Sequence, residues 1–312
     1  MVTIKKIEIK DYFGKGDFEW NLDPVVNILG GKNGSGKSSL FKLCYSLLSN
    51  EKMGKSLVEE LKKIFKEAVL TLSNGWTITW QPEMVTNFVE LNLDGQKPEM
   101  LRSVSVIKDE RGQRKQFSDL QDLIQAYMIN SFEQHIDKAI QYWQQPKSIS
   151  LNNPTMLDLM IYDQINLRNL KFSSAMENYI ESSEIADKKR REYASIYTKT
   201  YSVLEHFLKE YDKPFKSSFE FSKNGNKFGY EHLSMGEKQI LLLLLMVGNV
   251  NQEPCVFFMD EPDLSMHIDW KEILVKELHA LNPNMQIIVS THAPSVITGW
   301  KDRVEEVSHL IK

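Results

Sequence analysis

The 312-residue sequence has little cysteine, no long apolar run and no strong excess of charge of either sign. Its two cysteines, Cys44 and Cys255, lie far apart in apolar segments, which excludes a disulfide framework and favours a reducing compartment. The longest apolar run, residues 240–247, is too short to cross a bilayer, and Met1–Lys6 lacks a signal-peptide core. We therefore expect a cytoplasmic protein without a membrane partner.

The formal net charge is only −4, so the chain as a whole does not attract nucleic acid or anionic lipid. Metal-ligand spacing of cysteine and histidine is also missing. The length suits one large α/β domain or a domain that carries an insertion.

The segment Gly31–Ser38 reads G-x-x-x-x-G-K-S, between the apolar run Val25–Leu29 and the helix-like run Ser38–Cys44. In this strand–loop–helix context the glycines let backbone N–H groups point at a phosphate. Lys37 is expected to reach the β- and γ-phosphates, and Ser38 to bind Mg²⁺. The predicted nucleotide-binding residues of the loop are Asn33, Gly34, Ser35, Gly36, Lys37, Ser38 and Ser39.

Two strands downstream end in polar residues that suit phosphate chemistry. The buried-type strand 255–259 ends in Asp260 and Glu261. Asp260 would hold Mg²⁺, and Glu261 would accept the proton of an attacking water. His292 follows the strand 285–290, where it would sense or stabilise the γ-phosphate, because ligands gather at the carboxyl ends of parallel strands.

The segment from Ser234 to Glu237 has two interpretations that are compatible. Ser-x-x-Glu at the start of a helix is a capping box, which needs no ligand. A serine hydroxyl, Gly236 and a helix N-terminus also form a phosphate site. Both phosphate sites could serve one γ-phosphate if a second subunit supplies one of them.

The first hundred residues read mainly as short strands, which predict an antiparallel β layer. Tyr12 or Phe13 could stack on an adenine, although an aromatic residue closing a strand is more often part of the core. Apolar residues at helical spacing over 117–143 and again over 156–211 predict long helices. The predicted fold is therefore an α/β ATPase head, with a parallel sheet and an antiparallel layer, formed by residues 1–115 and 214–312, with a helical insertion at 116–213.

The motifs resemble those of the ABC-ATPase superfamily: the Walker A, signature, Walker B and switch-histidine motifs correspond to Gly31–Ser38, Leu233–Gln239, Asp260–Pro262 and Ser290–His292. The sequences of residues 234–239, 260–267 and 290–294 are similar to those of AAA-type ATPases of the OLD (overcoming lysogenization defect) branch. That branch includes stand-alone ATPases of bacterial anti-phage and retron-like modules. The resemblance covers residues 1–50 and 215–300.

The resemblance implies a head-to-tail homodimer with ATP between the phosphate loop of one subunit and Ser234 and Gly236 of the other. It also implies a glutamine lining the site, for which Gln113 and Gln116 are the candidates. Met235 and Glu237 replace a glycine and a glutamine of the transporter signature, which argues against a transporter subunit.

Two functions follow as expectations. The first is a regulatory ATPase that controls a separate nuclease or toxin in bacterial defence, because the twenty or so residues after His292 leave no room for a nuclease domain. Residues 116–213 would be the docking surface for that effector. The alternative is a DNA-repair or recombination ATPase that binds nucleic acid through Lys188–Arg191, although such a basic run is more often a solvated helix face.

Overall fold

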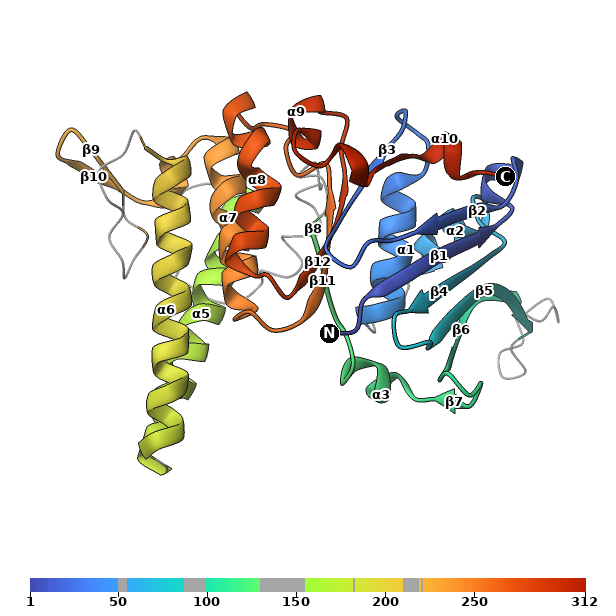
Figure 1. The fold of residues 1–312 in the computed structure, drawn as a ribbon, viewed down its shortest axis with the longest axis horizontal. Coiled ribbons are helices and arrows are strands. Elements are labelled where there is room, and N and C mark those ends of the chain that lie inside the picture. The colour runs from blue at the N-terminus through green and yellow to red at the C-terminus, as the bar shows by residue number, and fades with distance from the viewer. Residues whose placement is uncertain (50–54, 87–98, 130–154, 182, 210–218, 220) are drawn as a thin grey trace, which may run out of the picture.

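Helix α1 (Lys37–Ser49) lies between two β-sheets, and further helices cover the far side of one of them (Figure 1). The computed structural model describes residues 1–49, 55–86, 99–129, 155–181, 183–209, 219 and 221–312. This arrangement confirms the predicted α/β head with a parallel sheet and an antiparallel layer.

Five of the described strands form a parallel sheet in the order β13-β3-β12-β11-β8. Every residue of β11 and β12 is buried, as expected for strands that are covered on both faces. The carboxyl ends of these strands therefore meet at one edge of the sheet. The strands are β3 (Val26–Gly30), β8 (Gln125–Ile129), β11 (Cys255–Asp260), β12 (Met285–Ser290) and β13 (Val304–Glu306).

The other large sheet is antiparallel, in the order β2-β1-β4-β5-β6-β7. Buried residues alternate with partly exposed ones along β4, because one face of this sheet packs on the core. The buried Gln286 side chain of β12 donates to Ile4 O and accepts from Ile4 N, both at 2.8 Å, which joins the two sheets. The strands are β1 (Ile4–Lys10), β2 (Phe18–Asn21), β4 (Glu67–Leu72), β5 (Thr77–Thr86), β6 (Glu99–Lys108) and β7 (Arg114–Lys115).

The parallel sheet separates two apolar cores. Val256 and Phe258 face the core that contains α1 and the antiparallel sheet. Phe257 and Met259 face the core formed with α7 (Met235–Asn249) and α8 (Ile268–Leu281). Successive residues of β11 thus pack into opposite layers. This packing fixes the position of the carboxyl end of β11.

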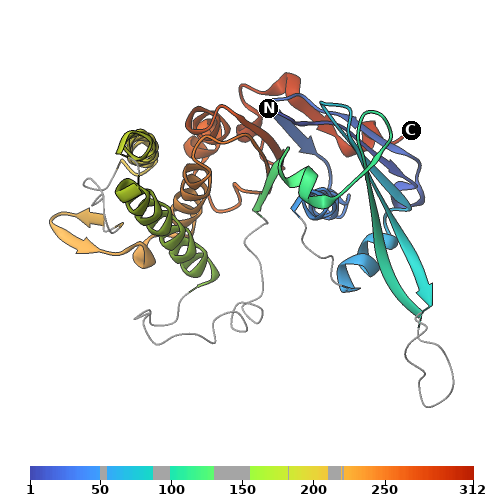
Figure 2. The same cartoon turned by 90° about the horizontal axis from the view of Figure 1, so that it is seen from below.

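Two long helices, α5 (Met156–Glu181) and α6 (Ser183–Phe207), form an arm that lies across α7 from the sheets (Figures 1 and 2). A buried ion pair of 2.7 Å joins Lys238 of α7 to Asp158 at the start of α5. At the other end of α7, the Asn249 amide donates to Gln164 O at 2.9 Å. The arm therefore holds α7 near both ends.

The helix predicted over residues 117–143 was wrong in its first half. Helix α3 (Phe117–Gln121) is short, and Gln125–Ile129 is strand β8, paired in parallel with β11. A short apolar run on a covered sheet cannot be distinguished from a buried helix by periodicity alone. Residues 130–154 lie outside the described residues, and the division into two ATPase halves and an insertion stays a prediction.

Shorter elements complete the description. Strands β9 and β10 form a hairpin that turns at Asn224-Gly225, and helix α2 precedes β4. None of the described helices is long and apolar enough to cross a membrane. These elements are α2 (Lys55–Lys62), β9 (Phe221–Lys223), β10 (Asn226–Phe228), α9 (Pro294–Ile297), α10 (Val307–Leu310) and the single-turn helices 12–14, 230–232 and 301–303.

Candidate functional site

The predicted phosphate loop joins β3 to α1, and its glycines are required by geometry. Gly31 and Gly36 have φ values of 146° and 91°, which residues with a side chain rarely adopt. A Cβ on Gly36 would lie 2.6 Å from the Phe13 ring and 2.7 Å from the Tyr12 hydroxyl. The loop therefore packs against the turn that follows β1, and only glycine fits at this contact.

Tyr12 and Phe13 have different environments. Tyr12 is only 1% exposed, and its hydroxyl donates to Ser35 O of the loop at 2.8 Å. It is a core residue that supports the phosphate loop, and its ring stacks on Phe18 at 5.0 Å. Phe13 is 36% exposed beside the loop, so it is the aromatic residue of this pair with a free ring surface.

The Lys37 side chain is bound inside the site. Its ammonium donates to Gly31 O at 2.7 Å and to Lys32 O at 3.3 Å, and it lies 2.9 Å from Nε2 of His292. Loss of hydration lowers the pKa of Lys37, and the Glu261 carboxylate is the strongest of the charges that oppose this shift. Lys37 of the Walker A segment thus contacts His292 after β12 and lies within the electrostatic influence of Glu261 after β11.

Asp260 is the last residue of β11, and Glu261 follows it with a left-handed backbone conformation. Asp260 is 2% exposed and accepts a hydrogen bond of 2.5 Å from the Ser290 hydroxyl of β12. Glu261 has a φ of 49°, and its N–H donates to Ser290 O at 2.9 Å. A left-handed non-glycine residue costs about 1–2 kcal/mol, and here it occurs at the predicted catalytic base.

His292 lies between Lys37 and Glu261. Its Nε2 lies 2.9 Å from the Lys37 ammonium and 3.4 Å from Glu261 Oε1. An ammonium group can only donate, so Nε2 acts as the acceptor when Lys37 is charged. These distances place the three side chains together beside the carboxyl ends of the strands, and their catalytic roles stay predictions.

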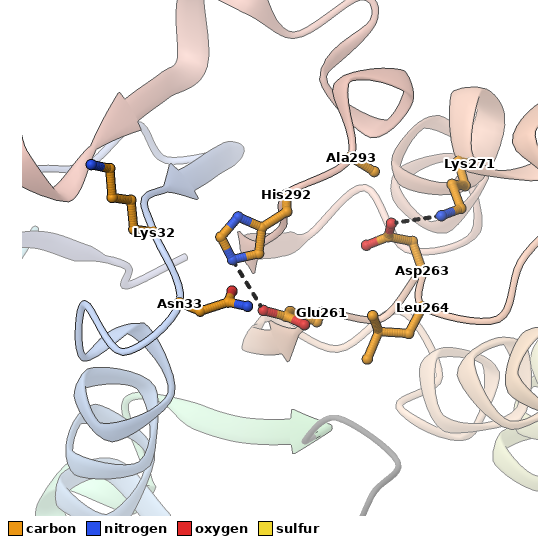
Figure 3. A pocket seen from close by; sticks show the side chains of 8 residues that line it. All are labelled: Lys32, Asn33, Glu261, Asp263, Leu264, Lys271, His292 and Ala293. Carbon is orange, nitrogen blue, oxygen red and sulfur yellow. Dashed lines mark ion pairs between the residues drawn. The ribbon is translucent and has the colours of Figure 1, made fainter.

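An open pocket of about 780 Å³ lies against this cluster (Figure 3). Its walls come from the phosphate loop, the segments after β11 and β12, and α8. Positive, negative and amide groups all line it, which suits a polyphosphate with a cation better than an apolar ligand. The lining residues are Lys32, Asn33, Glu261, Asp263, Leu264, Lys271, His292 and Ala293.

The signature segment forms the predicted capping box. The Ser234 hydroxyl accepts from Glu237 N at 3.4 Å, and the Glu237 carboxylate accepts from Ser234 N at 2.7 Å. A Cβ on Gly236 would lie 2.4 Å from Ser265 O, so this glycine lets α7 approach the loop after β11. Met235 is 47% exposed. The capping role is confirmed, and the phosphate role of Ser234 and Gly236 stays a prediction.

Of the residues predicted to bind nucleotide, Asn33 lines this pocket, whereas Gln113 and Ser39 have their hydrogen bonds elsewhere. Gln113 lies in the turn between β6 and β7, where its N–H donates to Asp109 at 2.8 Å. The Ser39 hydroxyl donates to Glu60 of α2 at 3.0 Å, and Ser39 is 8% exposed. Their roles as nucleotide ligands stay predictions.

Three residues that hold the site together, Asp263, Lys271 and Thr291, were not predicted from the sequence. Asp263 is buried between Lys271 of α8, at 3.2 Å, and Thr291, whose hydroxyl donates to it at 2.8 Å. Asp263 lies two residues after Glu261, so its proximity to the motif was a usable signal. Its pairing with Thr291, 28 residues further along, was not visible in the local sequence.

The fold resembles that of ABC-type ATPase heads. Two solved structures of SMC head domains superpose on 95% and 94% of this chain, each covering 91% of the SMC chain, with TM-scores of 0.56. One is an Smc head with an extended coiled coil bound to the C-terminal domain of ScpA from Pyrococcus furiosus. The other is an Smc head bound to the C-terminal winged-helix domain of ScpA. At 14% and 15% identity, this likeness concerns the fold.

The chain belongs to the family described as "AAA domain, putative AbiEii toxin, Type IV TA system", whose profile matches residues 116–298. This match covers more than half of the chain and includes the signature, Walker B and His292 segments.

Two curated relatives are retron proteins. The Retron Vc95 probable ATPase of Vibrio cholerae serotype O1 biovar El Tor is 36% identical over 87 residues, which are 24% of this chain and 17% of that protein. The Retron Ec83 probable ATPase of Escherichia coli is 27% identical over 169 residues, or 48% of this chain and 31% of that protein. The alignments therefore span less than a third of either relative.

Proposed function

We propose that the chain binds ATP with Mg²⁺ and hydrolyses it. The observation that carries this proposal is the meeting of Lys37, Glu261 and His292, which come from α1 and from the ends of β11 and β12. Lys37 binds the β- and γ-phosphates, and Glu261 accepts the proton of the attacking water. His292 exchanges its contact with Lys37 for one with the γ-phosphate.

The residues around the loop fit a magnesium nucleotide. Ser35 Oγ is buried and lacks a hydrogen-bond partner among the described residues, so the loop keeps an unused polar group. Ser38 is exposed at the start of α1, and Asp260 is oriented by Ser290. Oxygen ligands of this kind suit Mg²⁺, which when bound neutralises charge on the phosphates.

We propose further that the site is composite and that a head-to-tail homodimer completes it. Ser234 and Gly236 of a second copy would contact the γ-phosphate across the interface. The capping box leaves the Ser234 hydroxyl hydrogen free to donate, so capping and phosphate binding are compatible. Met235 and Leu264, which are 47% and 44% exposed, lie on the segments that such an interface would cover.

The biological role that we propose is control of a separate effector, a nuclease or toxin, in bacterial defence, as in OLD-like modules. The support is the retron origin of both curated relatives and the toxin–antitoxin description of the family. The arm of α5 and α6 offers the docking surface, since it is fixed to the signature helix α7 by Lys238–Asp158.

A second candidate function is direct binding of nucleic acid. Lys188 and Arg191 are exposed on α6, within the basic run that the sequence shows. A basic helix face of this kind contacts phosphates with a steep dependence on salt.

Glu261→Gln tests the proposed chemistry, because the amide keeps the size of the side chain and cannot accept the proton. ATP binding, measured with a fluorescent ATP analogue, should stay within about threefold of the wild type, while phosphate release should fall about 100-fold or more. Glu272→Gln on α8 is a matched control and should hydrolyse ATP normally. Phosphate release near the wild-type rate in Glu261→Gln would remove Glu261 from the role of base.

A further inference from the structure

A short chain of buried polar groups lies behind His292. The Thr291 hydroxyl donates to Asp263 Oδ1 at 2.8 Å, and the Ala293 N–H donates to the same hydroxyl oxygen at 3.0 Å. On the other side, Lys271 of α8 lies 3.2 Å from Asp263 Oδ2. Thr291 and Asp263 are 1% and 4% exposed, so the hydrogen bond between them is largely shielded from water.

These bonds hold the backbone on both sides of His292. One hydroxyl serves as donor to Asp263 and as acceptor from Ala293, the residue after the histidine. Asp263 itself follows Glu261 by two residues. The same contacts therefore join the segment that carries the base to the segment that carries the histidine, whose groups lie 3.4 Å apart.

We propose that Asp263 is a positioning residue for His292, acting through the Thr291 hydroxyl, and that Lys271 fixes the orientation of the Asp263 carboxylate. The proposal rests on the proposed ATPase function. Figure 3 shows Asp263 and Lys271 at one end of the pocket and His292 at the centre, so neither has to touch the reacting atoms to affect them. A purely structural role would alter stability and leave the rate unchanged once the protein is folded.

Thr291→Val removes the hydroxyl and keeps the shape of the side chain. We expect kcat for ATP hydrolysis to fall about 10- to 100-fold, with KM within about threefold, because a small misplacement of a catalytic group costs rate more than binding. Thr291→Ser keeps the hydroxyl and should restore kcat to within about threefold of the wild type. A Thr291→Val enzyme that is folded, as shown by its melting curve, and has wild-type kcat would overturn the proposal.

A double-mutant cycle with His292→Ala separates this inference from the proposed function. If Thr291 and Asp263 act through the histidine, then Thr291→Val should add less than about twofold to the loss caused by His292→Ala. Independent losses that multiply would overturn the positioning role and leave the ATPase function intact. Wild-type hydrolysis in both His292→Ala and Glu261→Gln would instead contradict the proposed function.

Substitution of Lys271 extends the same test. Lys271→Gln should lower kcat, by about 3- to 10-fold, because Asp263 then loses the partner that orients it. Lys276→Gln, which removes an exposed lysine from the same helix, should leave kcat unchanged. Equal rates in the two variants would overturn the role given to Lys271.

Discussion

The two motifs that are expected to enclose ATP are in different states of assembly. On the Walker side, Lys37, Glu261 and His292 come from three segments, and His292 contacts both of the others. On the signature side, Ser234 and Glu237 bond to each other at the start of their own helix. Within one chain the Walker residues therefore lie close together, whereas the signature residues form only the cap of their own helix. This difference is what the proposed composite site would explain.

The signature helix α7 and helix α1 also differ in the contacts that fix their positions. Helix α1 is enclosed between two sheets, whereas α7 is tied to the arm by the buried Lys238–Asp158 pair. Side chains of this pair are only 8% and 4% exposed. Because the arm contacts the signature helix directly, it is the surface that we propose for control by an effector.

Breaking the ion pair between the arm and α7 should have the largest effect on stability. Lys238→Ala leaves Asp158 buried without its charge partner, so we expect a decrease of about 3–5 kcal/mol in the free energy of unfolding, measured by urea denaturation. The double variant Lys238→Met with Asp158→Leu should lose less, since neither charge remains. The exposed Lys10→Ala is a control and should change stability little. A Lys238→Ala protein as stable as this control would contradict the link.

Removing the Walker lysine should have the next largest effect, and only on the Walker side. Lys37→Ala should weaken ATP binding about 10- to 100-fold, because the phosphates no longer have this charged donor. Lys42→Ala on the same helix is the matched control in a titration with a fluorescent nucleotide. Unchanged affinity in Lys37→Ala would take the lysine out of the binding site.

Ser234 allows capping to be separated from phosphate binding. Ser234→Asp keeps a good N-cap, so the melting temperature should stay close to that of the wild type. Its carboxylate would repel a γ-phosphate, so ATP turnover and ATP-dependent dimerisation should fall, by about tenfold or more. Ser234→Asn, a neutral cap, should retain more activity than Ser234→Asp. Wild-type activity in both variants would leave Ser234 with the capping role alone.

Substitutions on the basic face of the arm should have the smallest effect on ATP turnover if the partner is an effector protein. Substituting Lys188 and Arg191 by glutamine should then leave ATP turnover unchanged and DNA binding absent or insensitive to salt. If the chain binds nucleic acid directly, the logarithm of its affinity for DNA should fall steeply as the logarithm of the salt concentration rises. The substitution should then reduce that slope by about one for each phosphate that is no longer bound. The result decides between the two candidate functions.

Much of the Walker side could be predicted because its information is local. Apolar strands that end in Asp260-Glu261 and in His292, together with the phosphate loop, define one sheet edge without any long-range contact being known. The capping box of Ser234 was visible for the same reason. These patterns each occupy a few consecutive residues, and the fold brings their ends together.

What could not be predicted depends on residues far apart in the chain. Strand β8 resembled a helix, because the feature that makes it a strand is its pairing with β11, in which Gln125 lies opposite Cys255. The Asp263–Thr291 contact and the Lys238–Asp158 pair likewise join distant segments. Only the folded structure reveals that these polar residues are buried and paired.

Mixing two inactive variants tests the composite site most directly. Lys37→Ala has a defective Walker side and Ser234→Asp a defective signature side, so neither homodimer should hydrolyse ATP at more than about a tenth of the wild-type rate. A head-to-tail heterodimer contains one intact composite site. We predict that mixing the two proteins restores phosphate release to about a quarter of the wild-type rate, if subunits pair at random and sites act independently. Phosphate release equal to the sum of the separate variants would contradict the composite site.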